Sequence, residues 1–247
     1  MQLQDILYSQ GFGTRRVCAG LIQHGLVQVQ TAFESVDYVA CVQSDREFDP
    51  LGLRFRVQGV DWAYHAKAYI MLYKPEATEC SQKPSTYPSI YTLLPAPLRQ
   101  RPQKGAVQGV QAVGRLDQDT TGMLLLTDDG AFIHRLSSPR HHVPKVYEVK
   151  VKHPLTSVQL QKLMDGVVLD DDPKPVRAAA CEMVHEFHLR LTLTQGKYHQ
   201  VKRMLAAVSN RVEGLHRSQI GAVQLPATMQ PGQWHWLTDV QVKSLLS

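Results

Sequence analysis

The alternation of hydrophobic and polar residues predicts many short strands and few helices. Residues 146–151 and 189–194 alternate apolar with polar side chains, as a strand does when one of its faces is buried. Residues 69–75 and 123–126 are almost continuously apolar, which is typical of strands buried on both faces. Apolar residues at helical spacing predict helices over residues 131–136, 156–166 and 199–208. The apolar face of the second of these runs through Leu160, Leu163 and Met164. Thr238 and Gln241 form a capping box that predicts a closing helix. The pattern therefore indicates an α+β fold built on a mixed sheet.

The start of the chain carries its own pattern. Apolar residues share one helical face over residues 3–7, and Thr14 can cap a second helix. Residues 27–29 then alternate as a short strand. We expect this segment to belong to a small module over residues 1–60, followed by a larger domain over residues 61–247.

A charged loop with a glycine near each end, residues 113–122, comes directly before the apolar run of 123–126, and it places Asp117 at the entrance of a buried strand. A rigid strand that holds a carboxylate at its entrance is a common way to position a nucleophile or a general base. In the alternative interpretation, Asp117 and Asp119 only accept hydrogen bonds from backbone N–H groups of a turn. The residues of this loop, taken alone, favour the turn.

The same loop resembles the active-site signature of a known enzyme family. The positions that carry the likeness are residues 114–117, 119–120, 122, 124–130, 138–142, 145–149, 195–204 and 215–221. In combination they resemble the RsuA-type pseudouridine synthases, and the likeness covers nearly the whole chain. The later stretches are most similar to the members that act on small-subunit (16S) ribosomal RNA. The resemblance implies an enzyme that isomerises uridine to pseudouridine in that RNA, without a cofactor or a metal.

The resemblance also implies a fold and a set of roles. The small module should be an S4-like RNA-binding module, and the larger domain a catalytic domain with a mixed, mainly antiparallel sheet. Asp117 corresponds to the family's catalytic carboxylate, and Lys202 to the basic residue that offsets its charge. Tyr147 corresponds to the tyrosine that packs on the target base, and Arg115 to an arginine that fills the space left by the flipped uridine.

Basic residues in or near these motifs are expected to contact RNA. They are Arg15, Arg16, Lys74, Arg140, Lys145, Lys197, Arg203 and Arg217. Two positions beside Lys74 depart from the family, which has Asn where this chain has Tyr73 and Gly where it has Ala77. We therefore expect a differently shaped loop after residue 74.

The charge distribution favours a polyanionic partner for the larger domain. The chain has a net charge of +5 and a sequence pI near 9.0. The first 60 residues hold five Arg and six Asp or Glu, a net charge of −1, so the remaining residues carry +6. Basic stretches over residues 96–116 and 197–219 overlap or flank the motifs above. We expect most RNA phosphate contacts to lie in the larger domain.

Other bulk features suggest a cytoplasmic monomer. No apolar run reaches the roughly 18 residues that a membrane span requires, and the first residues lack the regions of a signal peptide. The four cysteines, Cys18, Cys41, Cys80 and Cys181, have no pairing or metal-ligand spacing, so we expect reduced thiols.

Two other functions fit part of the sequence. Residues 117–121 also satisfy Asp-x-Asp-x-Thr, the nucleophile loop of magnesium-dependent phosphatases of the haloacid dehalogenase type. That loop should follow a continuous apolar strand, and residues 111–115 do not form one. The other alternative is a non-catalytic RNA-binding protein of ribosome assembly. The presence of Asp117, Tyr147 and Lys202 argues against it.

Overall fold

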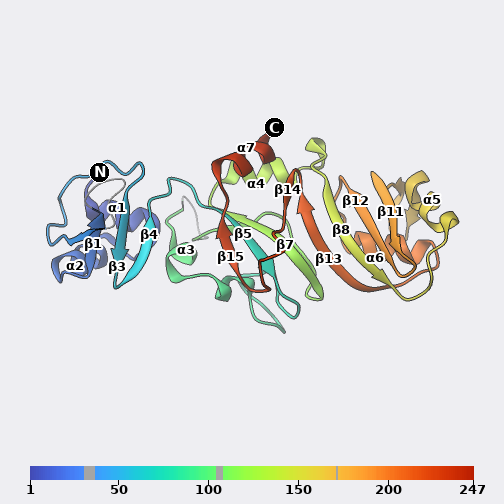
Figure 1. Cartoon of the computed structure of the whole chain (residues 1–247), viewed down its shortest axis with the longest axis horizontal. Coiled ribbons are helices and arrows are strands. Elements are labelled where there is room, and N and C mark those ends of the chain that lie inside the picture. The colour runs from blue at the N-terminus through green and yellow to red at the C-terminus, as the bar shows by residue number, and fades with distance from the viewer. Residues whose placement is uncertain (31–36, 104–107, 171) are drawn as a thin grey trace. The chain divides into compact units, whose positions relative to one another are not determined.

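The computed structural model describes residues 1–30, 37–103, 108–170 and 172–247 (Figure 1). They form two compact units, which are treated separately below. The first unit contains Met1–Ala68 and Leu94–Gln111, and the second contains Tyr69–Leu93 and Ala112–Ser247. The domain boundary expected at residue 60 stays a prediction. Within the described ranges, no helix is both long and apolar enough to cross a membrane.

The first unit combines two helices with a small antiparallel sheet. Helix α1 (Leu3–Gln10) ends at Gly11, which has a positive φ of 90°, and α2 (Arg15–Gln23) is capped by the side chain of Thr14. The sheet has the order β2-β1-β3-β4, formed by β1 (Val27–Gln30), β2 (Tyr38–Ala40), β3 (Arg54–Val57) and β4 (Val60–Ala63). The two expected helices and the expected first strand are confirmed. Their likeness to an S4 module stays a prediction.

A later segment of the chain completes this first unit. Helix α3 (Ala96–Gln100) leads to Arg101, which is only 2% exposed. The Arg101 guanidinium donates hydrogen bonds to Gln10 Oε1 at 2.9 Å and to the His65 carbonyl oxygen at 2.8 Å. Arg101 belongs to one of the two basic stretches expected to contact phosphate, but its burial gives it an internal, structural role. Lys104, in the same stretch, lies outside the described residues.

The second unit is organised around one long sheet. Its ladder has the order β11-β12-β8-β13-β7-β5-β15, with β14 beside β13 and β6 beside β7. The bounds are β5 (Tyr69–Lys74), β6 (Gln111–Ala112), β7 (Thr120–Thr127), β8 (Lys145–Val151), β11 (Ala180–His185), β12 (His188–Leu193), β13 (Val212–Ile220), β14 (Val223–Gln224) and β15 (Trp234–Trp236). Along the ladder β13 and β7 are parallel and every other described pair is antiparallel. The expected mixed, mainly antiparallel sheet is therefore confirmed.

Two helical pairs cover this sheet. Helices α4 (Gly130–Ser137) and α7 (Asp239–Leu246) contribute to a core with β5 and β7, whereas α5 (Ser157–Asp165) and α6 (Gln200–Ala207) pack against β8, β12 and β13 (Figure 1). Asp129 caps α4, and capping boxes start α5 and α7. Between the cores, the start of β7 lies beside β13, where the functional residues meet.

Some local expectations need correction. Met164, expected on the buried face of α5, is 37% exposed, because it lies in the last turn of the helix, where Leu163 takes the buried position. The strands β11 and β13 were not predicted. Polar side chains interrupt their apolar alternation: Glu182 faces solvent in β11, and the half-buried His216 lies in β13. The remaining short elements are a 3-10 helix at Ile90–Leu93, another at Pro139–His141, and the pair β9 (Val167–Leu169) and β10 (Asp172–Val176).

Candidate active site

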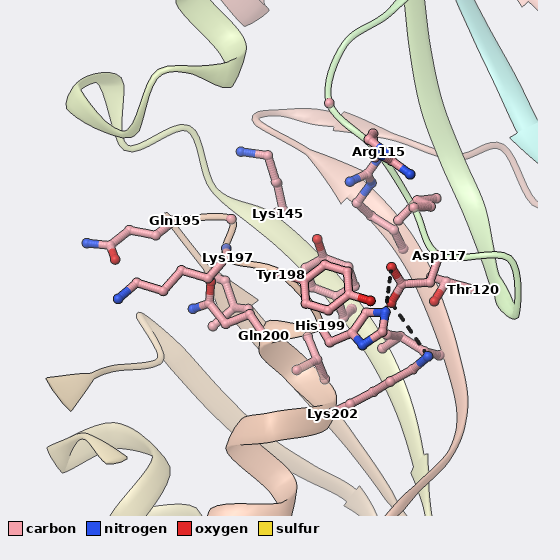
Figure 2. Close-up of a pocket in the computed structure, with 18 of the residues that line it drawn as sticks. Arg115, Asp117, Thr120, Lys145, Gln195, Lys197, Tyr198, His199, Gln200 and Lys202 are labelled. Atoms are coloured by element: carbon pink, nitrogen blue, oxygen red, sulfur yellow. Dashed lines mark hydrogen bonds and ion pairs between the residues drawn. The ribbon is translucent and has the colours of Figure 1, made fainter. Parts of the chain in front are cut away.

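A pocket of about 380 Å³ opens in the second unit. Stretches that are distant in sequence line it: the loop before β7, the end of α4, the start of β8, the loop that leads into α6, and β13 (Figure 2). All four residues expected to be catalytic, Arg115, Asp117, Tyr147 and Lys202, are among its lining residues. The structure thus brings together groups that the sequence separates by as many as 87 positions, counting from Arg115 to Lys202.

A buried lysine holds the Asp117 loop from behind. Lys74, at the end of β5, is 0% exposed, and its ammonium donates to the carbonyl oxygens of Gln118 at 3.3 Å and Thr120 at 2.9 Å. A third bond goes to the Pro75 carbonyl oxygen at 3.0 Å. Burial lowers the pKa of Lys74 below its usual value. The expected RNA contact of Lys74 is contradicted, because an ammonium enclosed by three carbonyls cannot reach a phosphate.

The loop after Lys74 has a glycine-like turn. Ala77 has a φ of 55°, in the left-handed region that glycine adopts without strain. Its N–H donates to the Gln118 carbonyl oxygen at 2.9 Å, so this turn is also hydrogen-bonded to the Asp117 loop. A glycine, which the resemblance places here, would suit the same backbone.

Gly122 lets β7 approach β13 closely. It has a φ of 107°, and a Cβ at this position would overlap the backbone carbonyl of Arg217 on β13. The two residues are register partners in the parallel pair of strands. Only glycine fits without a backbone shift, and Asp117 is five residues upstream on the same rigid segment.

Two cationic or ionisable groups flank the Asp117 carboxylate. His199 Nε2 lies 3.4 Å from Oδ1, and Lys202 Nζ lies 3.5 Å from Oδ2 (Figure 2). The Asp117 side chain is 29% exposed, so it is shielded from most water yet open to a ligand in the pocket. The Lys202 ammonium is close enough to attract the carboxylate and to hold it in one orientation.

Asp119 is the nearer partner of Lys202. The ammonium donates to both Asp119 oxygens, at 2.7 and 2.8 Å. Burial alone would raise the pKa of Asp119, but the hydrogen bond and charge of Lys202 outweigh it and lower that pKa. Lys202 therefore bridges two carboxylates, and the turn-capping role expected of Asp119 stays a prediction.

The start of α6 positions both partners of Asp117. His199 takes a φ of 49° directly before the helix, and Lys202 follows three residues later on the same side. Arg203 instead donates to the Tyr198 carbonyl oxygen at 3.2 Å. His199 lies within the motif of residues 195–204, but it was not expected to be functional. Its three-residue spacing from Lys202 is the signal that could have identified it.

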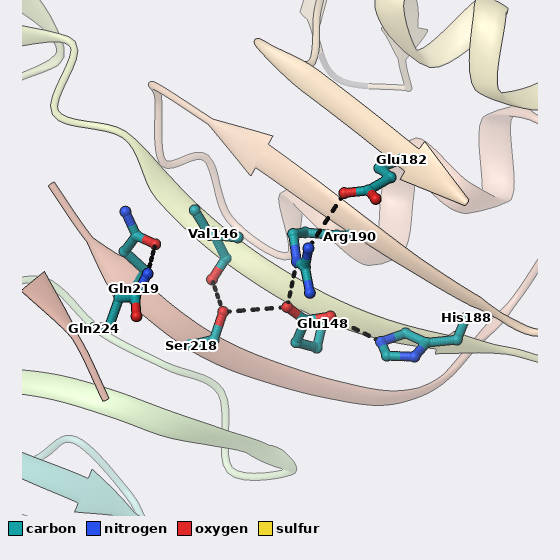
Figure 3. Close-up of polar contacts among 8 residues, drawn as sticks. All are labelled: Val146, Glu148, Glu182, His188, Arg190, Ser218, Gln219 and Gln224. Atoms are coloured by element: carbon teal, nitrogen blue, oxygen red, sulfur yellow. Dashed lines mark hydrogen bonds and ion pairs between the residues drawn. The ribbon is translucent and has the colours of Figure 1, made fainter. Parts of the chain in front are cut away.

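Tyr147 contributes the apolar wall of the pocket. It is partly buried, and it packs against the core behind β8 and α6. Its neighbour Glu148 points to the opposite face of the sheet, as strand alternation requires. There Glu148 accepts bonds from His188 and Arg190 at 2.9 and 2.8 Å and from Ser218 at 3.5 Å (Figure 3). This network ties β12, β8 and β13 together and fixes the strand that carries Tyr147.

The other expected RNA-contacting residues divide into three groups. Lys145 and Lys197 line the pocket, as Arg115 does. Burial, followed by the nearby charge of Arg217, lowers the pKa of Lys145 to about 8. Arg217 also lines the pocket but is only 2% exposed, and its Nε donates to the Met123 carbonyl oxygen at 2.8 Å. Its expected phosphate contact stays a prediction.

The remaining expected RNA-contacting residues lie outside the pocket. Arg140 is exposed on the 3-10 helix after α4. Arg15 and Arg16 are exposed in the first unit, where Arg15 pairs with Asp5 at 2.6 Å and lies over the Tyr8 ring. Contact of these three residues with RNA stays a prediction.

Comparisons with known proteins point in one direction. Residues 68–207 match the family described as RNA pseudouridylate synthase. The "Ribosomal small subunit pseudouridine synthase A" of Pasteurella multocida is 39% identical over 72% of this chain and 73% of its own. The protein of the same name from Escherichia coli K12 is 38% identical over 74% and 75%. A crystal structure of a pseudouridylate synthase superposes with a TM-score of 0.67 and 29% identity, over 99% of both chains.

Proposed function

The chain belongs to the RNA pseudouridylate synthase family, and from that membership we propose that it isomerises a specific uridine of small-subunit ribosomal RNA to pseudouridine, with Asp117 as the catalytic carboxylate. The observation that carries the proposal is the carboxylate of Asp117 inside the pocket, between His199 and Lys202. The names of the relatives support the small subunit as the source of the substrate.

The reaction needs few groups. The bond from ribose C1′ to N1 of uracil breaks, the base rotates, and C1′ bonds to C5 while the C5 proton is released and N1 takes up a proton. Atoms and charge balance without an oxidant, a reductant or an energy source. An ionised Asp117 can attack or stabilise the electron-poor centre that forms when the first bond breaks. Lys202 and His199 keep the carboxylate oriented in the pocket.

The target base has to leave its stack to reach Asp117. RNA-modifying enzymes offset the free energy of unstacking by contacts to the flipped base in a closed pocket. The ring of Tyr147 supports such a contact, and Arg115, exposed at the rim, supports the role of filling the vacated space. Lys145 and Lys197 supply positive charge for the phosphates on either side.

The alternative phosphatase is disfavoured by local structure. Its nucleophile should end a continuous strand, but Asp117 follows the two-residue strand β6 and precedes β7. An RNA substrate also supports the expected cytoplasmic location. That location and the monomeric state remain part of the proposal.

Asp117→Asn tests the proposal directly. The variant keeps the shape of the side chain and removes its charge, so isomerisation should fall to a trace of the wild-type rate while RNA binding persists. The assay is tritium release from 5-tritiated uridine in small-subunit ribosomal RNA. Asp165→Asn, on the exposed end of α5, is the matched control and should retain activity. Substantial turnover by Asp117→Asn would show that another group carries the reaction.

A further inference from the structure

An exposed aromatic side chain borders the pocket without a part in the proposed chemistry. Tyr198 is 75% exposed, although it is one of the lining residues. Single exposed aromatic residues are common on protein surfaces, so exposure alone would carry no inference. The surroundings of Tyr198 are, however, those of a binding group.

Tyr198 is fixed by ring stacking. Its ring lies on the imidazole of His199, with centroids 3.8 Å apart and planes inclined by 21° (Figure 2). Arg203 anchors its backbone by donating to the Tyr198 carbonyl oxygen at 3.2 Å. One face of the phenol ring is therefore covered, and the other is a flat surface that is already ordered before a ligand binds. Preorganisation of this kind lowers the entropic cost of binding.

A nucleobase is the ligand that this surface fits. Stacking of a base on an aromatic side chain contributes about 1–3 kcal/mol and tolerates any base, because every base has a π face. Lys145 and Lys197 line the same pocket, so a phosphate chain that enters it passes close to Tyr198. We propose that the outer face of Tyr198 stacks the base of a nucleotide beside the target uridine. This inference rests on the proposed function.

The stacked base cannot be the target itself. Asp117 meets His199, the inner ring of the pair, at 3.4 Å, and it must also reach the ribose of the target. A base on the outer face of Tyr198 would be separated from the His199 ring by the phenol ring, so we place it beside the target and not in the target position. Tyr147 remains available for the target. Tyr198 therefore selects RNA in which a neighbour of the target is also unpaired, as in a loop or a single strand.

Three substitutions of Tyr198 test the stacking. Tyr198→Phe keeps the flat ring, Tyr198→Leu keeps apolar bulk without it, and Tyr198→Ala removes both. On a fragment of small-subunit ribosomal RNA, the Leu and Ala variants should raise KM roughly 5- to 100-fold, with Phe close to wild type. The kcat and its pH profile should not change, because Tyr198 touches no reacting atom. Phe187→Ala, an exposed aromatic on the turn between β11 and β12, is the matched control.

An abasic nucleotide identifies the partner base. Once the target uridine has been mapped, fragments with one abasic site at each of the flanking positions complete a double-substitution cycle with Tyr198→Ala. At one position the Tyr198→Ala loss should disappear. Equal losses at every position would overturn the proposal, as would a loss in kcat or a shifted pH profile, which would make Tyr198 a positioning residue for His199. If the Tyr198 experiments give one of these contrary results while Asp117→Asn is inactive, only the stacking proposal is refuted. If Asp117→Asn is active, the proposed function is refuted.

Discussion

Replacing Lys202 by methionine keeps the length of the side chain and removes the charge that bridges Asp117 and Asp119. Coulomb's law with an effective dielectric constant of 20 gives about 5 kcal/mol for unit charges at the Lys202–Asp117 separation of 3.5 Å. The two side chains are 28% and 29% exposed, so water compensates part of this energy. We take about half, roughly 2–3 kcal/mol, as the loss in transition-state stabilisation. Isomerisation should then slow by about two orders of magnitude.

The effect should be on chemistry rather than on affinity. Lys202 contacts carboxylates and not the bulk of the pocket wall, so the variant should lose kcat with KM nearly unchanged. Single-turnover tritium release from 5-tritiated uridine measures the chemical step, and salt-dependent RNA binding measures affinity in parallel. Circular dichroism and thermal melting show whether the variant is folded.

Arg203→Met is the comparison that makes the test decisive. It removes an adjacent positive charge on the same helix, at a side chain whose guanidinium donates to the Tyr198 carbonyl oxygen, whereas Lys202 lies 3.5 Å from the Asp117 carboxylate. Its loss of activity should be the smaller of the two. A larger loss in Arg203→Met, or less than a tenfold loss in Lys202→Met, would refute the assignment of Lys202 as the partner of Asp117.

Two further changes test the scaffold and the pocket wall. Gly122→Ala should lower the free energy of unfolding by about 2–3 kcal/mol in thermal or denaturant melts, because its Cβ would overlap the Arg217 carbonyl. Gly130→Ala, with open space around it, should not lower it. Equal melting curves for the two variants would contradict the close approach. Lys145, whose pKa is about 8, is charged below that pH and loses its proton above it, so RNA affinity and the salt slope of binding should fall between pH 7 and 9. Lys145→Arg should stay charged and flatten this pH dependence, and identical profiles would show that Lys145 makes no phosphate contact.

Local chemistry explains why much of the second unit could be predicted. Helices α5 and α7 begin at capping boxes whose two reciprocal bonds involve residues three apart, so the signal lies within one turn. The apolar run within β7 could be recognised as a strand from the residues directly before and after it in sequence. Asp117 and Lys202 could be paired because a resemblance supplied the long-range link that periodicity does not contain.

The features that escaped prediction all depend on distant contacts. Nothing near Lys74 in sequence shows that its ammonium is enclosed by carbonyls from residues 118 and 120. The sequence alone predicts that Arg101 is an exposed cation, because its contacts with Gln10 and His65 are formed only in the folded chain. Strand β13 could not be predicted for the same reason. It contains polar side chains, and it is a strand because it pairs with β7, β8 and β14, which are formed by other parts of the chain.

The charges of the pocket impose an orientation on any RNA that enters it. The formal charges of Asp117, Asp119 and Lys202 sum to −1, so this end of the pocket disfavours a phosphate. Lys145, Lys197 and Arg115 line the pocket with positive charge. Phosphates are therefore favoured along that wall and disfavoured beside Asp117, which leaves the neutral base and sugar as the parts that can approach the carboxylate. The same separation keeps phosphate from competing for Lys202, whose two carboxylate partners hold it in place.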